Sequence, residues 1–192
     1  MKFCGIKQIN IDSIGLSQIY ISLDKYSAVT EWFCPEHMEI FQPVSVYDFG
    51  NSAYTLTDGH TRTLVAYQNG ISAVPAIYDN DDIVTNTLGQ MLYKADIEWC
   101  ARFGLLHIKH LENRIINKSK YEKLWMERCN RSYNLITGTS ENDRIELQAL
   151  VPELFLYGAS EDVSELYFEN ESGDLFVYRK HILLPEQDTK ND

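Results

Sequence analysis

The stretch TLTDGHTR, residues 55–62, combines groups that suit the binding of a negatively charged oxygen. If a helix begins after Gly59, its first amide N–H groups have no partner inside the helix, and the helix dipole adds positive charge there. Gly59 allows close approach and can adopt a positive φ. A phosphate could therefore bind the amides of residues 59–62, with Thr61 and Arg62 as further donors.

Asp58 complicates this reading because a carboxylate repels a bound anion. Two arrangements would remove the conflict: a Mg²⁺ ion between Asp58 and phosphate oxygens, or Asp58 acting as a base towards a substrate hydroxyl. In a simpler structural alternative, Asp58 caps the helix and pairs with Arg62 at i+4. The chemistry of these residues leaves both readings open.

The surrounding pattern predicts the elements that position this turn. A strand is expected around Ser17–Ser22, followed by a helix from Asp24 to Phe33 that stops near Pro35. Alternating apolar residues on both sides of GNS, residues 50–52, predict a β-hairpin. A helix after Gly59 that ends at Gly70 and a strand in AVPAIYD complete a compact α/β unit.

The second half of the chain is expected to be helical and then β-rich. Residues 86–134 read as helices, one ending at Gly104 and one starting with a capping box of Ser119 and Glu122. Residues 138–144 are the predicted linker, and the last part is expected to form a hairpin that turns at Glu171–Gly173. The acidic run at residues 161–171 is interpreted as solvated surface, with a docking site for a basic partner as the alternative.

Composition and charge narrow the possible functions. The 192 residues carry a net charge of −11, which argues against unaided, non-specific DNA binding. Four scattered cysteines without a CxxC pair favour a reducing compartment. With no signal peptide and no long apolar run, we expect a cytoplasmic protein that does not enter a membrane.

Two groups of residues outside the turn are also candidates for binding roles. Cys100, His107 and His110 have a spacing compatible with a metal site but lack a fourth ligand. The three tryptophans, Trp32, Trp99 and Trp125, are expected in the core or in an interface rather than as stacking platforms for bases.

The stretch PVSVYDFGNSAYTLTDGHTRTLVAYQNGISAVPAIYD resembles the core of the ParB/sulfiredoxin-like superfamily, with a match over about residues 8–80. The matching motif positions are Asp58, Gly59, His60 and Arg62. The resemblance implies a small mixed sheet with helices, in which the turn holds nucleotide phosphates. WC at 99–100 and LWMERC at 124–129 extend it to uncharacterised bacterial proteins with a ParB-like N-terminal domain.

Members of this superfamily differ at positions that can be compared with this chain. Sulfiredoxin needs a reactive cysteine directly after the glycine, where this chain has His60. ParB, a CTP-dependent DNA clamp, has an arginine-rich turn, whereas this turn has Arg62 alone. The free serine kinases carry a motif much like DGHTR and a catalytic glutamate on the helix after the first strand. Glu31 lies in the comparable helix, and Glu36 and Glu39 follow it.

Together these observations predict an α/β (α+β) protein with a nucleotide-binding core at residues 1–85. A helical segment at 86–137 would pack on the core, and a small acidic region with a β-hairpin would occupy residues 143–192. The expected function is binding of a nucleoside phosphate, with Mg²⁺-dependent phosphoryl transfer from ATP or ADP to a small hydroxyl compound. The expected site residues are Asp58 and Glu31 for catalysis, Gly59, His60, Thr61 and Arg62 for the nucleotide, and Asp58 for the metal.

Two alternatives come from other functional classes. The first is a non-catalytic, nucleotide-responsive module that acts through its helical or acidic C-terminal surface, where a protein partner would bind. CTP is a further candidate nucleotide besides ATP and ADP. The second is a ParB-like protein associated with DNA, which the acidic charge does not favour.

Overall fold

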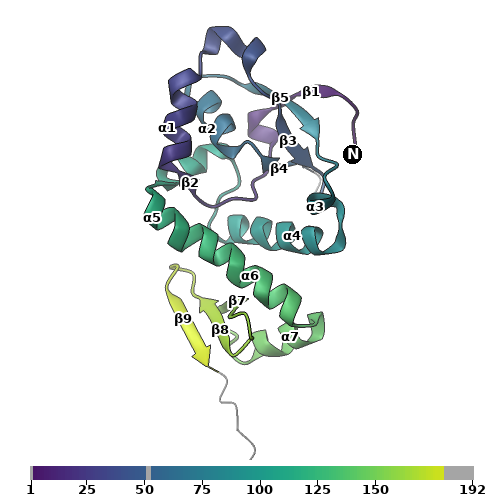
Figure 1. Cartoon of the computed structure of the whole chain (residues 1–192), viewed down its shortest axis with the longest axis vertical. Helices are drawn as coiled ribbons and strands as arrows, with labels where there is room; N and C mark the ends of the chain where they lie inside the picture. Colours follow the sequence, from purple (N-terminus) through teal and green to yellow (C-terminus); the bar gives the residue numbers. More distant parts are fainter. Residues whose placement is uncertain (1, 51–52, 180–192) are drawn as a thin grey trace, which may run out of the picture. The chain divides into compact units, whose positions relative to one another are not determined.

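The computed structural model describes residues 2–50 and 53–179. The chain forms two compact units, Met1–Cys129 and Asn130–Asp192, here called unit 1 and unit 2. The secondary structure is mixed α+β, as the sequence predicts, with a four-stranded mixed sheet in unit 1 and a three-stranded sheet in unit 2 (Figure 1). Within the described residues, none of the helices has the length and apolar character that a bilayer span requires.

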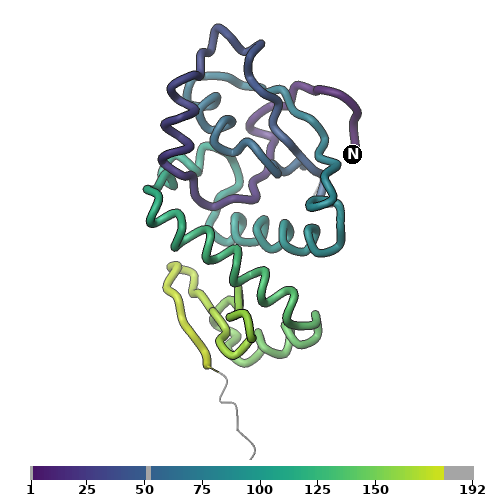
Figure 2. Tube along the Cα trace, viewed as in Figure 1, coloured from purple at the N-terminus to yellow at the C-terminus, as the bar shows by residue number. Residues whose placement is uncertain are grey.

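The elements follow the chain from the purple N-terminal end to the yellow strand β9 (Figure 2). The strands are β1 (Ile6–Asn10), β2 (Ile21–Ser22), β3 (Val44–Tyr47), β4 (Thr55–Asp58), β5 (Ala73–Tyr78), β6 (Ile115–Ile116), β7 (Phe155–Ala159), β8 (Glu165–Glu169) and β9 (Leu175–Arg179). The α-helices are α1 (Leu23–Trp32), α2 (His60–Gln68), α3 (Asp82–Thr85), α4 (Thr87–Arg102), α5 (Lys118–Tyr121), α6 (Glu127–Gly138) and α7 (Glu141–Ala149). Short 3₁₀ turns are η1 (Ile11–Ser13), η2 (Pro35–Ile40) and η3 (Ile108–Arg114), and η4 (Glu122–Met126) is π-helical.

The main sheet of unit 1 has the strand order β1-β5-β3-β4. β3 and β4 form the predicted antiparallel hairpin, while β5 runs parallel to β3 and antiparallel to β1. Val44, Val46 and Leu56 are fully buried, because alternate side chains of each strand face the core. Residues 51 and 52 of the predicted loop lie outside the described residues.

Helix α2 connects the hairpin to β5 and packs against α1 (Figure 1). Leu64, Val65 and Ala66 of α2 are almost fully buried, so this helix contributes directly to the core. The helix ends before Gly70, which has a φ of +78°, as the sequence predicts. The geometry of the turn before α2 is thus held by a buried helix and a buried strand.

Two parts of unit 1 differ from the sequence expectation. The sequence does not predict strand β1. Only Ile9 of its five residues is buried, so the strand carries no alternation of apolar and polar residues that would mark it. The strand expected around Ser17–Ser22 is limited to Ile21–Ser22, which pairs in parallel with β6. The segment before it forms an isolated bridge from Gly15 to Thr55, so it lies along the edge of β4.

The region predicted to be helical at residues 86–134 contains η3 and β6 between its helices α4 and α5. The helix predicted to end at Gly104 does so, and this glycine has a φ of +67°. The predicted capping box of Ser119 and Glu122 is wrong. Asn117 is the N-cap instead, and its Oδ1 accepts from the amide of Lys120 at 3.0 Å. Asparagine is as good an N-cap as serine, so the local sequence allows both starts.

In unit 2, helix α7 and the part of α6 that belongs to this unit pack against the sheet β7-β8-β9. Its core consists of Leu135, Leu156, Ala159, Leu166 and Phe168. The predicted hairpin is confirmed: β8 and β9 are antiparallel, and Gly173 in their turn has a φ of +85°. The linker predicted at 138–144 is wrong, because Ser140 and Asp143 form a capping box that starts α7.

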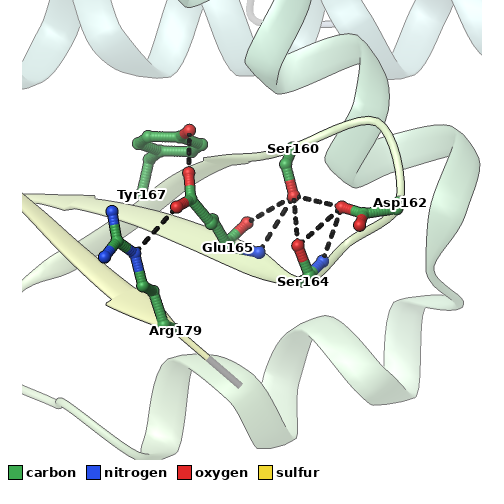
Figure 3. A network of polar contacts seen from close by, with 6 residues as sticks. All are labelled: Ser160, Asp162, Ser164, Glu165, Tyr167 and Arg179. Carbon is green, nitrogen blue, oxygen red and sulfur yellow. Dashed lines mark hydrogen bonds and ion pairs between the residues drawn. The ribbon is translucent and has the colours of Figure 1, made fainter. Parts of the chain in front are cut away.

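The acidic run of unit 2 is only partly solvated surface. Glu169 is 6% exposed, whereas the sequence suggests that it faces water. Asp162 accepts hydrogen bonds from the hydroxyls of Ser160 and Ser164, each at 2.7 Å (Figure 3). Glu165 accepts from the hydroxyl of Tyr167 at 2.7 Å and from Arg179 Nε at 2.9 Å (Figure 3). We call these six residues, Ser160, Asp162, Ser164, Glu165, Tyr167 and Arg179, the serine–acid network.

Candidate functional site

The turn between β4 and α2 has the conformation that the sequence suggests. Gly59 is the N-cap of α2 with φ +95° and ψ 14°, in the left-handed region. A Cβ at this position would lie 2.5 Å from Val44 Cγ1, so a side chain is excluded both by the backbone and by its neighbour. Glycine has no side chain that could cap the helix, which leaves amides of the first turn available to a ligand.

A pocket of about 340 Å³ opens at this helix N-terminus, and we call it the turn pocket. Its lining comes from Gln18, from Lys25, Ala28 and Val29 of α1, and from residues 58–62. Four of the residues predicted to bind a nucleotide, from Gly59 to Arg62, therefore line one cavity. The protein's own side chains therefore leave unfilled volume beside the first turn of α2.

Asp58 and Arg62 form the i,i+4 ion pair of the structural alternative. Arg62 Nη2 lies 2.9 Å from Asp58 Oδ2, with side-chain exposures of 20% and 71%. The other half of that alternative is wrong, because Gly59 and not Asp58 occupies the N-cap position. The same nitrogen of Arg62 lies 3.5 Å from the carbonyl of Pro43. The pair partly neutralises the guanidinium and competes with any anion for it.

Arg62 retains a donor that its protein contacts do not use. Its Nε is buried and has no hydrogen-bond acceptor among the described residues. An unmade hydrogen bond of a buried donor costs about 1–3 kcal/mol. Because this nitrogen is not exposed, an acceptor reaches it only after the Arg62 side chain shifts.

Lys25 is a second cation at the turn pocket, and sequence reasoning missed it. It lies on the exposed face of α1, more than 30 residues before the DGHTR motif. With Asp58 and Arg62 already paired, Lys25 gives the lining of the pocket an excess of positive charge. No local pattern marks this lysine, since the packing of α1 on α2 alone brings it to the turn.

His60 is buried and holds the turn in place. It is 4% exposed, and its Nε2 accepts a hydrogen bond from the amide of Ser17 at 3.2 Å. Burial lowers the pKa of His60 to about 4, against the opposing effect of Asp58. The ring is therefore neutral at pH 7, and with Nε2 as acceptor the hydrogen resides on Nδ1. The predicted role of His60 in nucleotide binding is left to its Nδ1–H as the donor and remains a prediction.

Glu31 does not lie among the residues that line the turn pocket. Lys25, Ala28 and Val29 share one face of α1, and Glu31 falls on a different, exposed face. Of the two glutamates that follow it, Glu36 accepts from Cys34 Sγ at 3.1 Å and Glu39 contacts His37 Nδ1 at 2.8 Å. The assignment of Glu31 as general base thus remains a prediction that the pocket does not support.

The described residues offer little for a metal ion held by protein ligands alone. They contain no group of three or more His, Cys, Asp and Glu side chains suited to this role. The sequence also offers Cys100, His107 and His110 as a possible metal site. In the structure, His110 Nδ1 accepts a hydrogen bond from the amide of Leu106 at 3.0 Å, so this ring nitrogen already has a partner. Mg²⁺ is commonly held by one or two carboxylates together with substrate phosphates. Asp58, the one carboxylate in the pocket's described lining, fits that kind of site.

Comparisons with known proteins do not identify this chain. No protein-family model matches it, and no curated protein matches its sequence. Among solved structures it is similar to the crystal structure of protein Atu1540 from Agrobacterium tumefaciens, with 12% identity over 74% of this chain and 83% of that chain. The TM-score is 0.34, which is too low to support an argument about fold or function. The ParB/sulfiredoxin-like resemblance therefore remains a prediction from the motif.

Proposed function

We propose that the turn pocket binds the phosphate groups of a nucleoside phosphate, ATP or ADP in the first place and CTP as the alternative. The observation that carries this proposal is an open pocket at a helix N-terminus that begins with glycine and is lined by two cations, Lys25 and Arg62. First-turn amides and the helix dipole attract anions, and a guanidinium adds charge-assisted hydrogen bonds. The resemblance of DGHTR to nucleotide-binding turns points to the same ligand class.

The proposal includes a rearrangement of the Asp58–Arg62 pair. A phosphate that binds Arg62 must replace Asp58, which is 71% exposed and free to move into water. Once released, Asp58 can face either a substrate hydroxyl or a Mg²⁺ ion that arrives with the nucleotide. Such an ion would neutralise phosphate charge, as in other phosphoryl-transfer sites.

Phosphoryl transfer to a small hydroxyl compound is the enzymatic form of this proposal. Asp58 supports it, because this carboxylate lines the same pocket as the residues that we assign to the phosphates. The position of Glu31 away from the pocket favours the second form, a nucleotide-responsive module without catalysis. In that case the C-terminal unit would be the part that contacts a partner.

Isothermal titration with ATP, ADP and CTP tests the binding proposal. Hydrogen bonds to charged groups contribute about 1.5–3 kcal/mol, so Arg62→Ala should weaken nucleotide binding by about 10- to 100-fold. Arg102→Ala is the matched control, because Arg102 forms a similar i,i+4 pair with Glu98 on α4, at 3.2 Å. Equal affinities of the two variants would refute the assignment of Arg62.

A product assay with L-serine and other small hydroxyl compounds separates the two forms. The enzymatic form predicts that Asp58→Asn retains nucleotide binding and loses turnover. Binding without turnover in the unaltered protein would support the module, and full activity of Asp58→Asn would refute the catalytic role of Asp58.

A further inference from the structure

A second pocket meets the turn pocket at Arg62. It has a volume of about 370 Å³ and is lined by Val29, Trp32, Ile40, Gln42 and Arg62. Val29 and Arg62 line both cavities, so the two cavities share a wall made of one apolar side chain and one guanidinium. We call this second cavity the Trp32 pocket. The Trp32 pocket is therefore a neighbour of the turn pocket.

Three of the five residues that line the Trp32 pocket are apolar, and two of these, Trp32 and Ile40, are exposed. Trp32 is 40% exposed and Ile40 is 59% exposed, whereas Trp99 and Trp125 are 1% and 7% exposed. Trp99 and Trp125 thus lie in the core, as the sequence predicts, and Trp32 does not. Large apolar side chains that remain in water next to a cavity are typical of a binding surface.

The Trp32 ring is held in position by other aromatic rings. Its centroid lies 6.2 Å from that of Phe33 and 6.4 Å from that of Phe41, which is 4% exposed. Phe33 and Phe41 also contact each other edge to face, with centroids 6.1 Å apart. This packing restricts the indole before a ligand binds, which lowers the entropy cost of stacking on it.

We propose that the Trp32 pocket binds the base of the nucleotide whose phosphates occupy the turn pocket. The inference rests on the proposed function and extends it from phosphate recognition to recognition of the ring. A planar heteroaromatic base would stack on Trp32, while Ile40 and Val29 cover its remaining apolar surface. The exposed amide of Gln42 offers a donor and an acceptor, the two kinds of group that the edge of a base requires.

Tryptophan fluorescence tests this inference, because Trp32 is the most exposed of the three tryptophans. The probes are ATP, CTP and inorganic triphosphate, which carries phosphate groups but no base. Stacking of a base on an aromatic side chain should make nucleotide binding about tenfold tighter or more than triphosphate binding. We also expect ATP or CTP, but not triphosphate, to quench the Trp32 emission.

Variants of Trp32 separate stacking from a general loss of structure. Trp32→Leu should remove most of the difference between nucleotide and triphosphate affinity and leave triphosphate affinity unchanged, while Trp32→Phe should retain more of that difference. The control is Ile83→Ala, which alters an exposed apolar side chain of α3 outside both pockets. Circular dichroism of each variant checks its folding.

The outcomes distinguish this inference from the proposed function. If triphosphate and nucleotides bind with equal affinity and Trp32→Leu has no effect, the base site is refuted and the phosphate site stands. If neither triphosphate nor nucleotides bind the unaltered protein, the proposed function is refuted and the base site with it.

Discussion

The turn pocket of unit 1 and the serine–acid network of unit 2 are both dense in polar groups, yet they differ in how these groups are satisfied. In the network, Asp162 accepts from two hydroxyls and from the amide of Ser164 at 3.0 Å. Ser160 Oγ in turn accepts from the amide of Glu165 at 2.9 Å (Figure 3). At the turn, Asp58 pairs with Arg62 and is 71% exposed beside a pocket.

This difference separates a structural cluster from a candidate binding site. The serine–acid network closes a β-turn region by satisfying its own donors and acceptors, so a ligand would have to break existing bonds. The turn pocket combines open volume, a helix N-terminus without a capping side chain and a buried donor of Arg62 without an acceptor. Polarity alone is thus a poor guide to binding, and unused hydrogen-bonding capacity next to free volume is a better one.

The largest loss of stability is expected from Gly59→Ala, which changes the turn that lines the pocket. A left-handed conformation costs a non-glycine residue about 1–2 kcal/mol, and forcing a methyl group against Val44 adds about 1–3 kcal/mol. We therefore expect the free energy of unfolding, measured with urea, to fall by about 4 kcal/mol.

Gly70→Ala is the matched control for this prediction. Gly70 has a φ of +78° but no atom within 4 Å of the place that an alanine methyl group would take, so only the backbone cost of about 1–2 kcal/mol applies. Equal losses in the two variants would contradict the packing argument at Gly59.

The second prediction concerns the pH dependence caused by His60. Its pKa is about 4 in the folded protein and about 6.5 in the unfolded chain, so the unfolded chain binds the proton more readily. The stability that neutral His60 supports is complete above pH 6.5 and is lost as the pH falls through 4. A shift of this size corresponds to about 3 kcal/mol over the whole window.

Urea unfolding at pH 7.5 and pH 4 measures this loss. His60→Gln should be less stable at pH 7.5 and should lose less stability on acidification than the unaltered protein. His37→Gln, which changes an exposed ring, is the control. The same pH dependence in His60→Gln and in the unaltered protein would show that His60 does not titrate as a buried group.

The smallest change in stability is expected from Asp162→Asn in the serine–acid network. Hydrogen bonds from Ser160 and Ser164 lower the pKa of Asp162 to about 2. Their stabilising effect is present above pH 4, the range in which the unfolded carboxyl is ionised, and is lost as the pH falls through 2. Asp162→Asn should therefore be less stable than the unaltered protein at pH 7, and the difference should shrink towards pH 2.

An NMR titration of the Asp162 carboxyl measures this directly, with Glu161→Gln as a control for a neighbouring charge. The comparison of the two regions also predicts that Asp162→Asn leaves nucleotide affinity unchanged. A weaker nucleotide affinity in this variant would contradict the interpretation of the network as purely structural.

Local sequence is sufficient for the elements that a few neighbouring residues specify. The β3–β4 hairpin, the glycine turn, α2 and the β8–β9 hairpin follow from apolar periodicity and from glycines at turns. The linker prediction at residues 138–144 is wrong because a serine and an aspartate three residues apart occur in a capping box as readily as in a linker. For the site, the motif identifies the four residues from Gly59 to Arg62 that line the turn pocket.

The sequence by itself determined the turn: Gly59 fixes the backbone, and Arg62 follows one helical turn after Asp58. Only the tertiary structure decided that Lys25 lines the same pocket and that Trp32 remains exposed beside it. It also decided that His60 is buried and accepts a hydrogen bond from the amide of Ser17. The physical reason is sequence separation. Short-range periodicity encodes which face of an element is buried, but contacts between residues 30 or more positions apart depend on how α1, α2 and the sheet pack together.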